Sequence, residues 1–354
     1  MNRWKLTYEL RIFFSEPVSS HSYSLRCFPG IRKTQDIRSC ICRITPCSGP
    51  QGRDRDSFGN SVLYGRIEEG CREFRVLVEA ETAVREGPEP EPSAWQKLGM
   101  YRYLAGIVDI YPAVNPLGID SITRGIPAFD LDMNRVFPGN RNGSMTEYVA
   151  ARLMEDLSGS DLCIDIHASN IFLTEIPQVR INELHRDRLV PMAEGLNVDL
   201  IWIHGNSTVL ESTLAYSLNS TGTPTLVVEM GVGMRITKAY CDQLTDGIFY
   251  VMKNMGMWSG PAKEVRKPLI AAGADPVSFL NAPVSGVFLS QAKHGDSLRK
   301  GDPVGLIVDP LEGTIRERLK APADGILFTI REYPVVNEGS LIARILKKEA
   351  DERA

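Results

Sequence analysis

The chain has 354 residues, of which 43% are hydrophobic and 24% are charged, an ordinary composition for a globular protein with room for one or two domains. Its formal net charge of −4 provides no broad basic field, which argues against nucleic acid or an anionic membrane as a partner. The sequence contains no run of about 18 apolar residues, so it predicts no membrane-spanning helix. Its first residues lack the apolar core and the cleavage site of a secretory signal, and we therefore predict a cytoplasmic location.

Residues 1–60 show neither strand nor helix periodicity over a useful length and are rich in Arg, Ser and Cys. We predict that they form a poorly specified N-terminal region. Three of the seven cysteines of the chain cluster here, at Cys40, Cys42 and Cys47. Their C-x-C-x4-C spacing has no second half with zinc-ligand spacing nearby, which favours ordinary thiols over a metal site.

Residues 61–270 carry the pattern of an α/β domain. Four short runs rich in β-branched residues predict buried strands, at 74–80, 107–111, 162–166 and 225–229. Between the second and third runs, Ser144-x-x-Glu147 forms a capping box that opens a helical pattern. A further helix is predicted over 238–253. Strands that alternate with helices predict a sheet that is at least partly parallel.

The pattern changes in residues 271–354, where short β-rich runs are separated by Gly, Pro and Asp. Ala282-Pro283-x-x-Gly286 recurs as Ala321-Pro322-x-x-Gly325, and each copy is followed by a glycine turn and a β-rich run. Two similar halves predict a small all-β module that looks like a barrel-sandwich hybrid of the biotinyl/lipoyl kind. Because the lysine-bearing tip of those carriers is absent, we predict a packing or substrate-gating role.

Polar residues end several of the predicted strands, where the loops of an open α/β sheet converge on a ligand. His167 follows the apolar run 162–166 and is either a functional residue or a core histidine satisfied by a carbonyl. Glu229 leaves a buried strand, and a carboxylate there needs a task or a salt bridge. Asn134 and Arg135 lie in a loop. The guanidinium fork of Arg135 suits a substrate carboxylate, and the alternative is an ordinary surface arginine.

Four motifs in a fixed order carry more information than any one of them. They are Asn115-Pro116-x-Gly118, the stretch from Arg124 through Asp132-Met133-Asn134-Arg135-Val136-Phe137-Pro138-Gly139, Asp165-Ile166-His167-Ala168-Ser169, and Gly222-Thr223-Pro224-Thr225-Leu226-Val227-Val228-Glu229. From about residue 74 onward, the chain resembles the succinylglutamate desuccinylase/aspartoacylase family, which is related to the zinc carboxypeptidases. The resemblance implies a zinc-carboxypeptidase-like mixed sheet flanked by helices, with a C-terminal all-β barrel-sandwich-like module.

The resemblance also implies roles for single residues. In that family one zinc ion is bound by a His and a Glu of one loop and by a second His from a later strand, which His167 matches. Glu229 matches the carboxylate that activates the attacking water. Arg135 with Asn134 matches the clamp for a substrate carboxylate, and Arg124 matches the arginine that polarises the scissile carbonyl.

The first metal motif of the family, His-Gly-Asp-Glu or His-Gly-Asn-Glu, departs here. Alignment on the glycine puts Glu86 at the place of the His and Glu89 at the place of the Glu. Glu-x-x-Glu could hold a divalent ion with weaker zinc selectivity. The alternatives are an acidic loop without a metal role, or a reading-frame change or non-native segment upstream. His204-Gly205-Asn206 resembles the start of the missing motif, but it follows His167 in the chain and lacks the Glu, so we favour a pocket-lining role.

These residues predict a metal-dependent hydrolase, a deacylase or amidohydrolase with one Zn²⁺ per chain. It would cleave an amide or ester bond of a small carboxylate-bearing substrate such as an N-acyl amino acid. Two other classes stay open. A catalytically impaired relative would bind small acidic metabolites through Arg135 without the metal, and a structural or assembly protein would use its β module for contacts. A small acidic molecule is the predicted partner, nucleic acid and membrane are not, and self-association into a homo-oligomer stays open.

Overall fold

A computed structural model describes residues 103–111, 113–127, 130–205, 211–273 and 275–348, and the backbone of five strands nearer the N-terminus. Those strands are β1 Leu25–Arg26, β2 Cys42–Ile44, β3 Gly52–Arg55, β4 Ser61–Tyr64 and β5 Glu73–Val78. Cys40, Cys47 and the side chain of Cys42 lie outside the described residues, as do Glu86 and Glu89, so the expectations about them stay predictions. In the described part of the chain, no helix is both long and apolar enough to cross a membrane.

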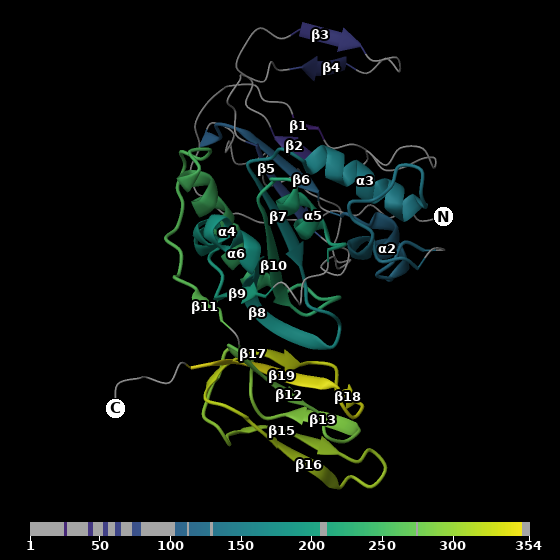
Figure 1. Cartoon of the computed structure of the whole chain (residues 1–354), viewed down its shortest axis with the longest axis vertical. Coiled ribbons are helices and arrows are strands. Elements are labelled where there is room, and N and C mark those ends of the chain that lie inside the picture. Colours follow the sequence, from purple (N-terminus) through teal and green to yellow (C-terminus); the bar gives the residue numbers. More distant parts are fainter. Residues whose placement is uncertain are drawn as a thin grey trace.

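A large mixed sheet forms the centre of the chain (Figure 1). Its strands after β5 are β6 Ile107–Tyr111, β7 Leu162–His167, β8 Leu173–Asn182, β9 Leu200–His204, β10 Thr225–Gly231 and β11 Leu269–Ala271. The order across the sheet is β6-β5-β7-β10-β8, with β9 and then β11 beyond β8. Neighbours from β6 to β10 run parallel, whereas β8 is antiparallel to β10. The predicted α/β fold with a mixed sheet is confirmed, and the four predicted strands correspond to β5, β6, β7 and β10.

The two predicted helices are also present, and local sequence explains where the first one begins. Helix α3, Met145–Leu157, has Ser144 as its N-cap, and the reciprocal Ser144–Glu147 hydrogen bonds of the capping box are both formed. Helix α6, Lys238–Asn254, matches the second prediction. The other helical segments are α2 Pro116–Ser121, η3 Met133–Arg135, η4 Glu183–His185, α4 Arg186–Ala193, η5 Glu194–Leu196 and α5 Leu214–Ser220.

The alternation of side chains along β7 assigns a different core to each face of the sheet. Leu162, Ile164 and Ile166 pack in a cluster with residues of α4 and α6, whereas Cys163 packs on the other face with residues of α3 and α5. Burying one such aliphatic side chain contributes roughly 1.5–3 kcal/mol, so a one-residue slip of β7 is strongly disfavoured. Because Asp165 and His167 have the parity of Cys163, their side chains lie on the α3/α5 face.

The C-terminal module is a β-sandwich-like unit built from two sheets, as predicted. Its strands are β12 Val277–Asn281, β13 Gly286–Ser290, β14 Ser297–Leu298, β15 Pro303–Val308, β16 Ile315–Lys320, β17 Gly325–Arg331, β18 Val335–Val336 and β19 Leu341–Lys347. The repeated Ala-Pro-x-x-Gly pattern has a packing reason. Ala282 and Ala321 are both buried in the core of the module. A Cβ on Gly286 would lie 2.6 Å from the carbonyl oxygen of Val308, and one on Gly325 would lie 2.0 Å from that of Leu346.

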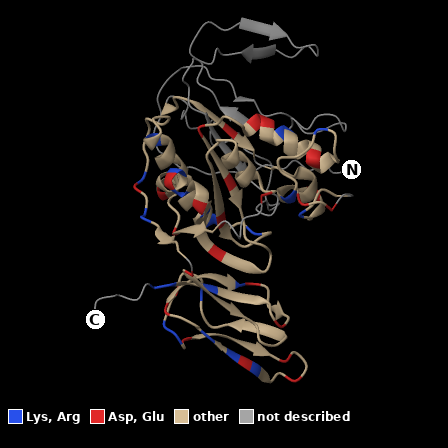
Figure 2. Cartoon of the chain, in the orientation of Figure 1, with Lys and Arg blue, Asp and Glu red and all other residues tan. Residues whose placement is uncertain are grey.

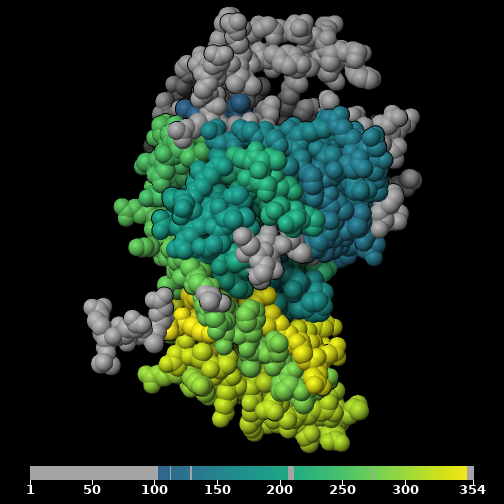
Figure 3. All heavy atoms as spheres, in the orientation of Figure 1, coloured from purple at the N-terminus to yellow at the C-terminus, as the bar shows by residue number. Residues whose placement is uncertain are grey.

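The module is continuous with the central sheet. Strand β17 pairs antiparallel with β8, with Thr329 opposite Glu175, and β19 and β12 follow beyond β17. The space-filling view shows the module as a lobe joined to the rest of the chain at this level (Figure 3). Acidic and basic residues are interspersed along both parts, and no broad region of one sign stands out among the described residues (Figure 2).

Candidate active site

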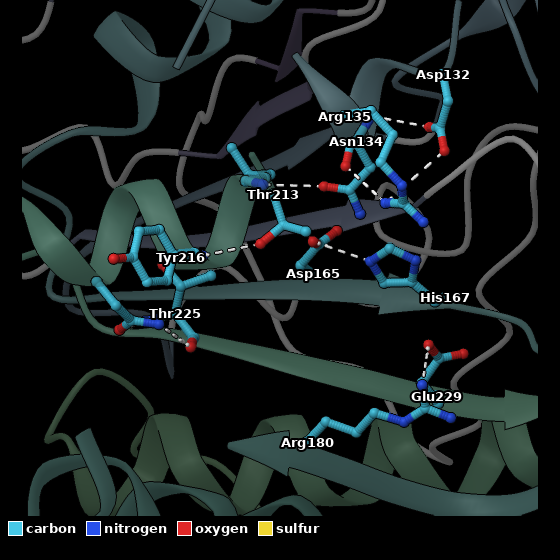
Figure 4. Close-up of polar contacts among 12 residues, drawn as sticks. Asp132, Asn134, Arg135, Asp165, His167, Arg180, Thr213, Tyr216, Thr225 and Glu229 are labelled. Carbon is cyan, nitrogen blue, oxygen red and sulfur yellow. Dashed lines mark hydrogen bonds and ion pairs between the residues drawn. The ribbon is translucent and has the colours of Figure 1, made fainter. Parts of the chain in front are cut away.

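The described site residues gather at the carboxyl ends of β7 and β10. These strands pair in parallel with Asp165 opposite Val227 and His167 opposite Glu229. Register partners in a sheet share a face, so His167 and Glu229 project to the same side, away from α4 and α6. Figure 4 shows His167 with Asn134 and Arg135 on one side of it and Glu229 on the other.

A buried carboxylate accompanies His167 on β7. The Nε2 atom of His167 lies 2.9 Å from Oδ2 of Asp165, and both side chains are buried. Neither oxygen of Asp165 accepts a hydrogen bond in the structure, so the carboxylate lies beside the imidazole without a well-aligned hydrogen bond to it. Imidazole nitrogen and carboxylate oxygen are both ligand types of Zn²⁺, so the donors that this pair presents fit a divalent cation. Across the described residues, however, no group of three or more His, Cys, Asp and Glu side chains gathers that could hold a metal.

Glu229 forms a salt bridge, which the sequence analysis gave as the alternative to a catalytic role. Its Oε1 lies 3.3 Å from Nη1 of Arg180, a residue of β8. The Glu229 side chain keeps 14% exposure, so it is held by the arginine without being sealed off. Burial lowers the pKa of the Arg180 guanidinium, but the charges of Glu229 and Glu175 outweigh it and raise that pKa above its ordinary value. A salt bridge and a catalytic task are thus compatible at this residue.

The arginines of the second motif are oriented by one acidic residue, Asp132. Its Oδ2 lies 2.9 Å from Nε of Arg124 and 3.8 Å from Nη1 of Arg135, and its Oδ1 accepts the backbone N–H of Asn134 at 2.9 Å. Both arginine side chains stay more than two-fifths exposed and can reach a ligand. Sequence reasoning included Asp132 in the motif but assigned it no role. The signal was its position at the N-cap of η3, the short helix that contains Asn134 and Arg135.

Asn134 has a structural partner in addition to its predicted substrate role. It is buried, and its Oδ1 accepts the backbone N–H of Leu214, the first residue of α5, at 2.9 Å. The loop of η3 is thereby tied to the helix that covers this face of the sheet. Only the Nδ2 end of the amide is left to serve as a donor in the clamp.

We expect Asn134→Ala to lower the free energy of unfolding by about 1–3 kcal/mol, because it leaves the buried N–H of Leu214 without an acceptor. Urea unfolding measures the change. The control is Asn140→Ala, an exposed asparagine of the same loop, which should shift stability by less than about 0.5 kcal/mol. Equal effects of the two substitutions would contradict the anchoring role.

His204 lies apart from His167. It ends β9, and β10 and β8 separate that strand from β7. Its ring stacks on Trp202 with the ring centroids 4.2 Å apart. Burial, with the charges of Arg180 and Arg344, lowers the pKa of His204 to about 4, so the ring is neutral at neutral pH. The expected pocket-lining role stays a prediction.

The backbone of β5 shows where the chain enters the segment with Glu86 and Glu89. Strand β5 lies between β6 and β7 and runs parallel to both. Its last residue, Val78, is the register partner of Ile166, directly before His167. The chain therefore leaves β5 at the edge of the sheet that carries His167, although the two glutamates lie outside the described residues.

Comparisons of the sequence with protein-family models gave two matches. Residues 95–255 match the family model described as the succinylglutamate desuccinylase/aspartoacylase catalytic domain, and residues 4–83 match the model described as the bacterial transglutaminase-like N-terminal region. Glu86 and Glu89 fall between the two matched ranges. A search of curated proteins gave no match.

Solved structures share the fold at low sequence identity. The product-bound structure of the ectoine utilization protein EutE (DoeB) from Ruegeria pomeroyi has a TM-score of 0.67 and 18% identity, over 87% of this chain and 94% of that one. A succinylglutamate desuccinylase/aspartoacylase from Rhodobacter sphaeroides has a TM-score of 0.64 and 20% identity, over 90% and 99%. An aspartoacylase family protein from Mesorhizobium loti has a TM-score of 0.61 and 18% identity, over 93% and 100%. At these identities the likeness concerns the fold alone.

Proposed function

We propose, from the membership of residues 95–255 in the succinylglutamate desuccinylase/aspartoacylase catalytic-domain family, that the chain is a metal-dependent hydrolase of small carboxylate-bearing substrates. N-acyl amino acids are the expected class, with cleavage of their amide bond, or of an ester bond in related substrates. The observation that supports the proposal most is the register of β7 and β10, which presents His167 and Glu229 on one face of the sheet. The cytoplasm remains the proposed location.

The metal is the finer part of the proposal. His167 would be one ligand, and Glu86 and Glu89 would supply the others from the segment that follows β5. A zinc ion bound there would polarise the scissile carbonyl and bring the pKa of a bound water toward about 7. Asp165, buried beside His167, would orient the imidazole and favour a positive charge at this position.

The other groups have roles that follow from their own chemistry. Glu229 would accept a proton from the attacking water and return it to the leaving amine, with Arg180 holding its carboxylate in place. Arg124 would donate to the developing oxyanion. Arg135, with Nδ2 of Asn134, would bind a carboxylate of the substrate. Asp132 would hold both arginines in the orientation that these contacts require.

A second candidate function is supported by the departure at Glu86. Asn134 and Arg135, the proposed substrate clamp, are present, whereas Glu86 stands where the proposed alignment expects the first histidine of the metal motif. A catalytically impaired relative with this combination would bind small acidic metabolites through Arg135 and would not turn them over.

Metal analysis together with an activity assay separates the two functions. For the purified chain, elemental analysis should detect zinc at well below one ion per chain. Weak hydrolysis of a panel of N-acetyl and N-succinyl amino acids should be lost on chelation and return with Zn²⁺. A folded protein that binds these acids, contains no metal and shows no hydrolysis with added zinc would support the binder and contradict the hydrolase.

We expect Arg135→Met to raise KM by about 10- to 100-fold, because a charge-assisted pair with the substrate carboxylate contributes about 1.5–3 kcal/mol. Steady-state kinetics on the best substrate of the panel provides the measurement. Arg141→Met is the matched control, since Arg141 is a nearby exposed arginine that pairs with Glu155. Similar KM values for Arg135→Met and the unmodified protein would remove Arg135 from the clamp.

A further inference from the structure

Four charged residues form a continuous charge network that extends from the C-terminal module to Glu229. Arg344 of β19 donates to Glu175 of β8. Glu175 accepts from Nη2 of Arg180 at 2.9 Å through its Oε2 atom. Nη1 of the same guanidinium lies 3.3 Å from Oε1 of Glu229 on β10. Arg180 thus bridges two carboxylates, Glu175 at the module interface and Glu229 at the candidate active site. Figure 4 shows the second of these contacts.

The charges in this network balance only when all four residues are present. Glu175 has no exposed surface, so its carboxylate must be neutralised by the two arginines. Without Arg344, the whole negative charge of Glu175 would act on Arg180 alone. Since one guanidinium has to serve both carboxylates, its contact with Glu229 would weaken. Arg344 of the module therefore determines how strongly Arg180 can bind the carboxylate of Glu229.

Neighbouring side chains hold the residues of this charge network in place. Thr329 of β17 donates its hydroxyl to Oε1 of Glu175 at 3.1 Å, and the two residues are register partners where β8 meets β17. The guanidinium carbons of Arg180 and Arg344 each lie 5.7 Å from the ring of Trp202, which gives both cations the same aromatic support. The module thus contributes side chains and a strand edge to the environment of Arg180.

We propose that Arg344 and Arg180 are positioning residues, through which the C-terminal module holds the carboxylate of Glu229 in the orientation needed for catalysis. The inference rests on the proposed role of Glu229 as the base of the hydrolase. It gives the β module a part in the reaction that requires no contact with the substrate.

Kinetics of Arg344 variants test this role. Arg344→Met should lower kcat by about 10-fold or more and leave KM within about twofold, because a misplaced base affects the chemical step more than ground-state binding. Arg344→Lys, which keeps the charge, should retain most of kcat. The control is Arg235→Met. Arg235 also joins the two parts of the chain, through an ion pair with Glu332 at 2.9 Å. Because both side chains of this pair are exposed, the variant should leave kcat and KM unchanged.

A double variant separates positioning from packing. Glu175→Gln combined with Arg344→Met removes one charge of each sign, so Arg180 no longer has to serve two carboxylates. This variant should recover most of the kcat that Arg344→Met loses, although it carries one more substitution. If both variants lost kcat equally, Arg344 would have a packing role only, and the proposal would be overturned.

Crystal structures give a reading that does not depend on activity. In Arg344→Met the Arg180 guanidinium should turn toward Glu175 and leave hydrogen-bond distance of Glu229, and in the double variant the contact should return. If the contact persists unchanged in Arg344→Met, the proposal is wrong. If the unmodified protein hydrolyses nothing, the proposed function fails, and the structures still decide whether the module positions Glu229.

Discussion

Glu229→Gln should lower kcat by about 10²- to 10⁴-fold, the usual contribution of a general base, and leave zinc content unchanged. The amide has nearly the shape of the carboxylate and can still accept from Arg180, whose Nη1 lies 3.3 Å away, so the fold should be preserved. What the variant loses is the ability to take a proton from water. Steady-state kinetics and elemental analysis of the same preparation measure both quantities.

Glu155→Gln is the control for this prediction. Glu155 lies on α3 and makes exposed ion pairs with Arg141 and Arg152. Its substitution should change kcat by less than about twofold, since exposed pairs contribute little. A Glu229→Gln protein with wild-type kcat would exclude Glu229 as the base. A protein that had lost its zinc would instead indicate that the carboxylate supports the metal.

The elements that were predictable are those with local causes. The capping box at Ser144 and Glu147 determines the start of α3 by hydrogen bonds within four residues. The run of β7 is buried on both faces, and that of β10 is buried except at half-buried Val227 and Glu229, as expected for parallel strands covered by helices. Their alternation also predicts which side chains share a face, so that His167 and Glu229 could be placed together once the two strands were known to be neighbours.

The parts that were not predictable depend on contacts between distant segments. Glu175 and Arg344 are 169 residues apart, and no local pattern links them. Their proximity follows from the pairing of β8 with β17, which extends one sheet from the α/β part of the chain into the module. Sequence patterns described the module as a separate unit and did not indicate that it shares a sheet edge with the domain. Arg180 went unnoticed for the same reason, since its partners lie on three different strands.

Restoring a histidine at position 86, where the first metal motif of the family would begin, should strengthen zinc binding. We expect the double change Glu86→His with Pro88→Asp to raise zinc content from well below one to about one ion per chain, because a catalytic zinc usually has three protein ligands of this type. Hydrolysis of N-acyl amino acids should rise in parallel. An imidazole in place of one carboxylate improves zinc selectivity, and removing the proline restores the family's loop sequence. Elemental analysis and the hydrolysis assay measure the two gains.

The same double change made in a His167→Ala background distinguishes a rebuilt zinc site that includes His167 from zinc bound elsewhere on the chain. If the new histidine completes a site with His167, the gain in zinc should disappear when His167 is absent. Zinc that persisted would belong to some other place on the chain. The backbone supports the first outcome, since β5 ends at Val78 beside Ile166, at the edge of the sheet where His167 lies.

The competing account is that the segment between the two family matches is foreign to the catalytic domain. Residues 4–83 and 95–255 match different families, and Glu86 falls between them. On that account a histidine at this position would be too far from His167 to share an ion, and neither zinc nor hydrolysis would increase in a protein that still folds. The two accounts differ in a single geometric requirement. The chain must return within eight residues from Val78 to a position where an imidazole and the ring of His167 reach the same ion, and the zinc stoichiometry of the double change measures whether it does.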